Sequence, residues 1–187
     1  HQQYHANFGH LRGQFGILPQ TPAFFRASLR DNVVMGREGL SDLAVMQALA
    51  RSGAQTWVSR LPKGLDTLLG EGGSGLSSGQ RQTLALARAL VAVPAMIIMD
   101  EPTSHLDQQT EGTVQRTLRG LPTGTTLFLV THSPALLEAV DRLIVMEKGR
   151  ILLDGAKAHV LAQLRGVVEK RREASPAVPV QTAGGAA

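Results

Sequence analysis

The stretch MIIMDEPTSHLD, residues 96–107, decides the fold class of this chain. It opens with an apolar run without polar alternation, which predicts a strand covered on both faces, as in a parallel sheet. The strand ends in Asp100 and Glu101, whose side chains point to opposite sides if the chain is extended. Ligands of α/β folds bind beyond the carboxyl ends of the strands, so one carboxylate is expected to hold Mg²⁺ while the other activates a water. A solvated acidic turn before Pro102 is the alternative interpretation.

Similar apolar runs recur along the chain. Residues 127–130 (LFLV) and 143–146 (LIVM) predict two more strands, and 15–18 (FGIL) is a weaker candidate. Helix-like stretches lie between and around them, at residues 41–52, 54–61, 78–93, 108–121, 134–140 and 156–164. This alternation predicts an α/β fold on a mostly parallel sheet with right-handed crossovers. Residues from about 21 to 90 offer helices but no convincing strand, so they are expected to form an inserted helical subdomain.

The bulk composition narrows the function classes. The chain has 187 residues, the length of one domain, and its 43% hydrophobic and 18% charged residues are typical of a globular protein. Aromatic residues make up only 4% and the net charge of +4 is scattered, which argues against a nucleic-acid partner. The absence of cysteine excludes disulfides and thiolate metal sites. No apolar stretch is long enough to predict a transmembrane helix.

A glycine- and serine-rich stretch, EGGSGLSSGQRQ at 71–82, leads directly into an apolar helix. A helix that begins after such a turn points unpaired backbone N–H groups outward, with the positive end of the macrodipole behind them. This arrangement suits a phosphate. A flexible loop that ends in a serine cap is the alternative interpretation.

Two polar residues follow the other strand candidates. His132 comes two residues after the LFLV strand, and Gln20 comes two residues after FGIL. Because parallel strands end at the same edge of a sheet, both are expected near Asp100 and Glu101. A lone histidine is more often structural, but at this position His132 is expected to reach the same phosphate.

Five segments resemble, in order and spacing, the ATP-binding cassette (ABC) ATPases across about residues 12–165. They are Gln20 in ILPQ, LSSGQ at 76–80, IIMDE at 97–101, HLD at 105–107 and His132 in VTHS. In the same order, they match the Q-loop, the signature motif, the Walker B motif with its catalytic glutamate, the D-loop and the switch histidine. Each segment alone is a weak signal, whereas all five in order are very specific. The resemblance implies a P-loop NTPase-like fold. It also implies that the protein uses ATP and Mg²⁺.

The resemblance also implies a role for each matched residue. Asp100 would hold Mg²⁺. Gln20 would sense the same ion and couple the nucleotide site to a membrane domain. Glu101 would act as the general base, and His132 would stabilise the γ-phosphate.

The signature loop is implied to contact a nucleotide that is bound mainly by a partner domain packed head to tail. Ser77, Gly79 and Gln80 would make these contacts, and Asp107 would link the two nucleotide sites across the dimer. Ser78 departs from the glycine usual in the family. If that position needs a positive φ or a close backbone approach, serine is expected to weaken the loop modestly.

Finer features resemble the exporter branch of the family. PQTPAFFRASLRDNV at 19–33 and LPKGLDTLLGEGGSGLSSGQRQ at 61–82 are similar to exporter segments around the Q-loop and ahead of the signature. DRLIVMEKGRILLDGAKAHVLAQL at 141–164 is similar to the type I secretion ATPases, which move large proteins out of Gram-negative bacteria. The resemblance implies an ATPase at the cytoplasmic face of the bacterial inner membrane, with a second ATPase domain and a transmembrane domain as partners.

One motif of the family is missing from the sequence. No G-x-x-x-x-G-K-[ST] phosphate-binding loop (Walker A) is present. We therefore expect a partial ABC ATPase domain at 1–165, the C-terminal part of a longer polypeptide that supplies this loop, and a disordered tail at 166–187. The chain alone is expected to bind ATP poorly, to be inactive and, with sheet edges left open, to be poorly soluble.

Two alternative functions stay open. A non-catalytic remnant or regulatory subunit would only offer its signature loop to a partner; the missing Walker A loop favours this hypothesis, and the intact Glu101 and His132 oppose it. A soluble ABC ATPase of DNA repair would place a long coiled coil between the Q-loop and the signature. The short interval from Gln20 to Ser77 contains no heptad repeat.

Overall fold

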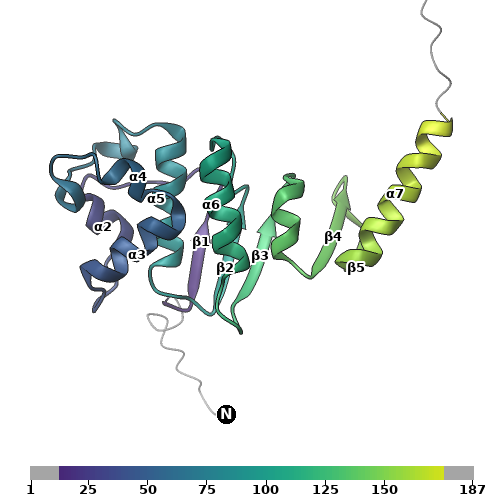
Figure 1. The fold of residues 1–187 in the computed structure, drawn as a ribbon, viewed down its shortest axis with the longest axis horizontal. Helices are drawn as coiled ribbons and strands as arrows, with labels where there is room; N and C mark the ends of the chain where they lie inside the picture. Colours follow the sequence, from purple (N-terminus) through teal and green to yellow (C-terminus); the bar gives the residue numbers. More distant parts are fainter. Residues whose placement is uncertain (1–12, 175–187) are drawn as a thin grey trace, which may run out of the picture. The chain divides into compact units, whose positions relative to one another are not determined.

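The structure is a computed structural model that describes residues 13–174 (Figure 1). Its contacts divide the chain into two compact units, one before Val140 and one from Val140 onward. The first unit contains a parallel sheet with helices, and the second contains an antiparallel hairpin followed by a helix. Within the described residues, no helix is both long enough and apolar enough to cross a membrane.

The first unit is built around a three-stranded parallel sheet. Strands β1 (Phe15–Leu18), β2 (Met96–Asp100) and β3 (Thr126–Val130) lie side by side in that order (Figure 1). The register aligns Leu18 with Met99 and Asp100 with Val130, so all three strands end at one edge of the sheet. The parallel sheet expected from the sequence is confirmed, including the weak candidate strand at 15–18.

One face of this sheet is covered by helices. Ile97 and Met99 on that face are fully buried in one cluster with residues of α5 (Ser78–Leu90) and α6 (Gln108–Arg119). The backbone of α5 approaches β1 so closely that a Cβ on Gly16 would lie 2.2 Å from the Ala89 carbonyl oxygen. Any residue larger than glycine at position 16 would therefore push α5 away from the sheet.

The opposite face carries exposed apolar side chains. Phe15 and Ile17 of β1 and Phe128 and Val130 of β3 are all exposed. The expectation of strands covered on both faces is therefore wrong for the described residues. Successive side chains of a strand alternate between its faces, and the described helices of this unit cover one side only.

Helices occupy the chain between β1 and β2. They are α2 (Leu29–Val34), α3 (Asp42–Ser52), α4 (Gln55–Val58) and α5, with short 3₁₀ helices η1 (Gly64–Asp66) and η2 (Glu71–Gly73) before α5. Ser28 and Ser41 begin α2 and α3 as N-caps, because their side chains accept from backbone N–H groups of the first turn. Within the described residues, no strand of either sheet lies between residues 21 and 90. The grouping of these helices into a separate subdomain stays a prediction.

A half-buried arginine, Arg88, joins α5 to this helical region. The Nε of Arg88 donates to the carbonyl oxygen of Asn32, and Nη1 donates to that of Ala23, each at 2.8 Å. The guanidinium also lies 4.7 Å from the ring centre of Phe24. Burial, with a smaller contribution from the Arg37 charge, lowers the pKa of Arg88 to about 10. Carbonyl dipoles and an aromatic face therefore hold this charge in place.

The second unit is an antiparallel hairpin followed by a helix. β4 (Arg142–Glu147) pairs with β5 (Arg150–Ala156), and α7 (Lys157–Ala174) follows. The sequence predicted the strand at 143–146 but not β5, and its expected place in the parallel sheet is wrong: in the described chain β4 pairs antiparallel with β5 in a sheet of its own. Lys148 and Gly149 have φ of 50° and 75°, as a two-residue type I′ turn requires, so the Lys-Gly pair was the missed signal for the hairpin.

The helix boundaries near the C-terminus also differ from those expected. The stretch at 134–140 forms a 3₁₀ helix, η3 (Pro134–Ala139), in the first unit. α7 begins at Lys157 and continues past residue 165, where the tail was expected to begin. Residues 175–187 of that expected tail lie outside the described part of the chain.

Candidate functional site

Three polar positions follow the ends of the parallel strands. Gln20 comes two residues after β1, Glu101 directly follows β2, and His132 comes two residues after β3. Because the strands are parallel and in register, all three positions lie at the carboxyl edge of the sheet. This is the edge at which α/β proteins bind ligands.

Glu101 and His132 contact each other at this edge. The backbone N–H of His132 donates to Glu101 Oε1 at 3.0 Å, and Nδ1 of the imidazole lies 2.8 Å from the same oxygen. A carboxylate only accepts, so this contact requires the proton on Nδ1. The Glu101 side chain is 16% exposed and that of His132 is 86% exposed. The pair therefore presents an open imidazole beside a more enclosed carboxylate.

Asp100 and Gln20 are available to a ligand. Asp100 is half-buried at the end of β2 and Gln20 is exposed, and no hydrogen bond or ion pair engages either side chain within the described residues. Among those residues, no group of three or more His, Cys, Asp or Glu side chains is placed to hold a metal ion. This donor set still fits Mg²⁺, which binds through one or two carboxylates and completes its shell with water and phosphate oxygens.

The signature segment begins α5 with a capping box. Ser77 is the N-cap: its Oγ accepts from the N–H of Gln80 at 3.2 Å, while the N–H of Ser77 donates to Gln80 Oε1 at 2.9 Å. The Gln80 side chain is thus committed to the cap. The N–H groups of Ser78 and Gly79 have no intrahelical partner at this position and are the donors available to an anion.

Close packing explains the glycine at position 79. A Cβ on Gly79 would lie 3.1 Å from the carbonyl oxygen of His105, so α5 rests directly on the loop that follows β2. Ser78 is the first residue of the helix and is not among the described residues with positive φ. The conformational reason for which serine was expected to weaken the loop is therefore absent.

Asp107 is the N-cap of α6. Its Oδ1 accepts from the N–H of Thr110 at 2.8 Å and its Oδ2 from the Thr110 hydroxyl at 3.0 Å. These hydrogen bonds lower the pKa of the Asp107 carboxyl. Both carboxylate oxygens are engaged within the chain, and the role of Asp107 in linking two sites stays a prediction.

Sequence reasoning missed two contacts around the site. The buried side chain of Gln82 donates from Nε2 to the carbonyl oxygen of Glu101 at 3.1 Å. The hydroxyl of Ser133, next to His132, donates to Glu111 Oε1 at 3.0 Å. The sequence offered no local signal for Gln82, which lies between Arg81 and Thr83.

A groove of about 420 Å³ begins next to the Q-loop position. Pro19, the neighbour of Gln20, contributes to its wall, and apolar side chains such as Phe25 and Met35 dominate the lining. The guanidinium groups of Arg37 and Arg88 add positive charge. The groove thus combines apolar surface with a preference for anionic groups.

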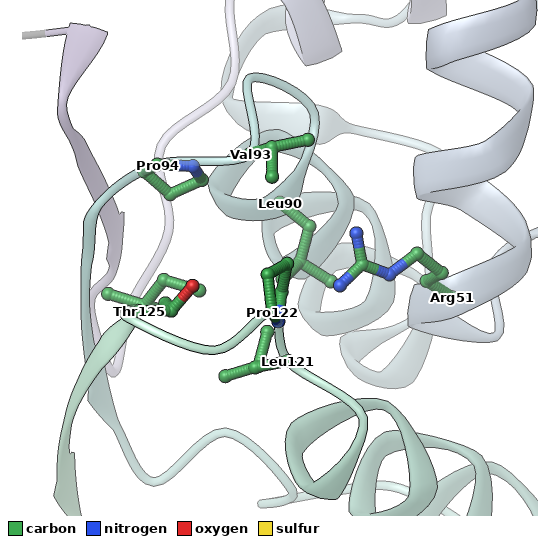
Figure 2. Close-up of a pocket in the computed structure, with 8 residues that line it drawn as sticks. Arg51, Leu90, Val93, Pro94, Leu121, Pro122 and Thr125 are labelled. Carbon is green, nitrogen blue, oxygen red and sulfur yellow. The ribbon is translucent and has the colours of Figure 1, made fainter.

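Figure 2 shows a different hollow, at the opposite edge of the sheet. Pro94 and Thr125, which line it, come just before β2 and β3 begin, and the other lining residues include Leu121 and Pro122. Arg51 is the only charged residue among those that line it. The hollow therefore has no acid or base of the kind found at the carboxyl edge.

Comparisons with known proteins agree with this geometry. The ABC transporter family model matches residues 1–104, and a model described as an AAA domain, putative AbiEii toxin, matches residues 74–138. A solved structure of a bacterial Atm1-family ABC exporter with ATP bound superposes with a TM-score of 0.77 and 31% identity, covering 91% of this chain and 30% of that one. The expected P-loop NTPase-like fold class is confirmed.

Curated relatives are similar over most of the chain. The cyclolysin secretion/processing ATP-binding protein CyaB of Bordetella pertussis is 40% identical over 152 residues, which cover 81% of this chain and 21% of the relative. The alpha-hemolysin translocation ATP-binding protein HlyB of Escherichia coli is 38% identical over 153 residues, covering 82% and 22%. The chain thus spans about a fifth of the length of these relatives. Together with the Glu101–His132 pair and the signature helix, the match of the family model over more than half of the sequence shows that the chain belongs to the ABC transporter family.

Proposed function

We propose that this chain is an ATP-hydrolysing module of an ABC exporter. The observation that carries the proposal is the contact between Glu101 and His132 at the carboxyl edge of the sheet. The N-terminus of α5 packs on the loop after β2, so the signature N–H groups belong to the same region of the fold. A carboxylate held beside an imidazole is suited to activate the water that attacks a triphosphate.

In the proposed mechanism, Glu101 is the general base. Its Oε1 is held by His132, whereas no hydrogen bond engages Oε2 within the described residues. Oε2 accepts the proton of the water that attacks the γ-phosphate. Nδ1–H of His132 holds the carboxylate in orientation, and the exposed Nε2, when it also carries a proton, donates to a γ-phosphate oxygen.

In this proposal Asp100 and Gln20 would hold Mg²⁺, because both side chains are unengaged in the described structure and lie at the carboxyl edge of the sheet. When bound, Mg²⁺ neutralises charge on the phosphates. Asp100 would thus bind the ion, and Gln20 would link the ion site to the neighbouring groove.

The signature N–H groups serve a nucleotide held mainly by a second ABC ATPase domain, packed head to tail with this one. The sequence contains no G-x-x-x-x-G-K-[ST] loop, and that loop supplies most β- and γ-phosphate contacts in P-loop enzymes. We infer that the 187-residue chain alone binds ATP weakly and does not hydrolyse it. Asp107 would link the two sites across the dimer interface.

Protein export by a type I secretion system is the transport function proposed for the whole assembly. The relatives named for secretion of cyclolysin and translocation of hemolysin support this proposal. The groove next to Gln20 is suited to an apolar segment with acidic residues, as a contact with a transmembrane domain would require. The site of action would be the cytoplasmic face of the bacterial inner membrane.

A non-catalytic subunit that only offers its signature loop is the second candidate, favoured by the missing phosphate-binding loop. The test compares Glu101→Gln with the exposed Glu38→Gln in the full-length gene product. The first variant is expected to accumulate as a closed dimer with ATP and Mg²⁺, seen by size-exclusion chromatography, while Glu38→Gln and the wild type do not. A Glu101→Gln protein that behaves like the wild type would favour the non-catalytic subunit.

A further inference from the structure

The backbone of Glu101 is held in an unusual conformation. Its φ is +48°, a left-handed value that residues other than glycine rarely adopt. The N–H of Glu101 donates to the carbonyl oxygen of Val130 at 2.9 Å, which fixes the residue to the end of β3. The Glu101 carbonyl oxygen accepts from the N–H of Ser104 at 3.1 Å. Such strain persists only where the surrounding contacts maintain it.

Gln82 supplies one of these contacts from another element. Its Nε2 donates to the Glu101 carbonyl oxygen at 3.1 Å, and the residue is only 3% exposed. A buried amide that loses its partner is costly, so the side chain is strongly restrained in this position. Gln82 therefore fixes the orientation of the peptide that follows Glu101.

The same helix carries the signature residues. Gly79 lies one turn before Gln82 on α5 and packs against the carbonyl oxygen of His105. The first two turns of α5 thus contact the loop after β2 at two points, at His105 and at Glu101. A shift of the helix N-terminus would be transmitted to the Glu101 backbone through the Gln82 amide.

We propose that Gln82 is a positioning residue that couples the signature helix to the general base. It holds the left-handed conformation of Glu101, and the carboxylate is aimed at its water only while α5 is seated on the loop. This inference rests on the proposed function and deepens it: contact of the signature with a partner's nucleotide would adjust the base of the chain's own site.

The first test replaces Gln82 by methionine, which keeps the length of the side chain and removes the donor. In the full-length gene product, Gln82→Met is expected to lower kcat for ATP hydrolysis by about ten- to hundredfold, because a small misplacement of a catalytic group has effects of this size. The KM for ATP should stay within about twofold, since the binding groups are unchanged. Hydrogen exchange of the segment 100–106 without nucleotide should become faster, as the Glu101 peptide loses a restraint.

The second test measures a pH dependence of kcat that a merely structural role of Gln82 would not produce. In Gln82→Glu, a protonated carboxyl can donate to the Glu101 carbonyl oxygen, whereas the ionised form repels it. Burial raises the pKa of a carboxyl group, so kcat relative to the wild type should recover as the pH falls from about 8 to about 6. Gln82→Met should show no such recovery.

Thr83→Val is the matched control. Thr83 is equally buried, at 3%, on the same helix; its hydroxyl accepts from Trp57 Nε1 at 3.1 Å and bonds within its own helix to the carbonyl oxygens of Gly79 and Gln80 at 3.0 and 3.1 Å, and none of these contacts reaches Glu101. This variant should lose a similar amount of thermal stability and keep kcat within about twofold, because it leaves the Glu101 peptide in place.

The outcomes separate this inference from the function on which it rests. A wild-type protein that hydrolyses no ATP would overturn both. An active wild type with unchanged kcat in Gln82→Met, or with an equal loss in Thr83→Val, would overturn the role of Gln82 alone. If Gln82→Met fails to fold, the pH profile of Gln82→Glu decides, and a profile parallel to that of the wild type would count against the proposal.

Discussion

The two faces of the parallel sheet carry the same types of apolar residue, but the side chains of one face are buried and those of the other are exposed. Ile97 on one face is 1% exposed under the helices, whereas Ile17 on the other is 56% exposed. Ile97 lies in the middle strand β2 and Ile17 in the edge strand β1, and the residue type alone does not distinguish them. Among the described residues, the apolar burial of the first unit is thus concentrated on one face of the sheet.

The largest expected effect tests this difference directly. Ile97→Ala should lower the free energy of unfolding by about 2–5 kcal/mol, because it removes buried methyl groups and leaves a cavity. Ile17→Ala changes the same atoms on the exposed face and should cost less than about 1 kcal/mol. Urea denaturation of the two variants and the wild type measures both values; equal losses would mean that both faces are covered in solution.

The half-buried Arg88 sharpens the comparison, because it joins the covering helix α5 to the helices before it. Arg88→Met should cost about 2–3 kcal/mol, since it leaves the carbonyl oxygens of Asn32 and Ala23 without a charged donor. Arg26→Met, at an exposed position in the same region, should stay within about 0.5 kcal/mol of the wild type. Thermal unfolding of both variants is the measurement, and similar melting curves would contradict the structural role of Arg88.

The exposed face should govern association more than stability. Exposed apolar patches on a sheet are sites of aggregation, and Ile17 and Phe128 are aligned with Ile98 of β2 between them. Replacing Ile17 and Phe128 by threonine should reduce self-association in light scattering of the 187-residue chain. The double variant should keep nearly the unfolding free energy of the wild type. A monodisperse wild-type chain would contradict the expected poor solubility.

The smallest effect concerns the cap of the other covering helix, α6. The lowered pKa of Asp107 means that its ionised cap stabilises the fold above the carboxyl's ordinary pKa of 3.8, and that this contribution is lost as the pH falls through the lowered value. Asp107→Asn keeps a capping acceptor and does not titrate. Wild type should therefore be slightly more stable than the variant at neutral pH, and the gap should close in acid; a constant gap in denaturation from pH 7 to pH 3 would reject this account.

The sequence predicted the carboxyl edge of the parallel sheet better than the C-terminal part of the chain. Asp100, Glu101 and His132 were found because apolar runs end beside them, and strand ends in a parallel sheet share an edge. The hairpin partner β5 was missed because its pairing depends on a two-residue turn at Lys148 and Gly149. Gln82 was missed because its contact joins positions 19 residues apart, which no local pattern records. Which face of the sheet the helices cover was also unpredictable, because it depends on contacts between positions far apart in the sequence.

ATP hydrolysis by the full-length gene product is the most direct measurement of the central account. Glu101→Gln keeps the hydrogen-bonding shape of the side chain and removes its basicity, so it should lower kcat by about a hundredfold or more. The exposed Glu38→Gln should hydrolyse ATP at the wild-type rate. Wild-type hydrolysis by Glu101→Gln would contradict the assignment of the base, and with it the reading of the carboxyl edge as the catalytic centre.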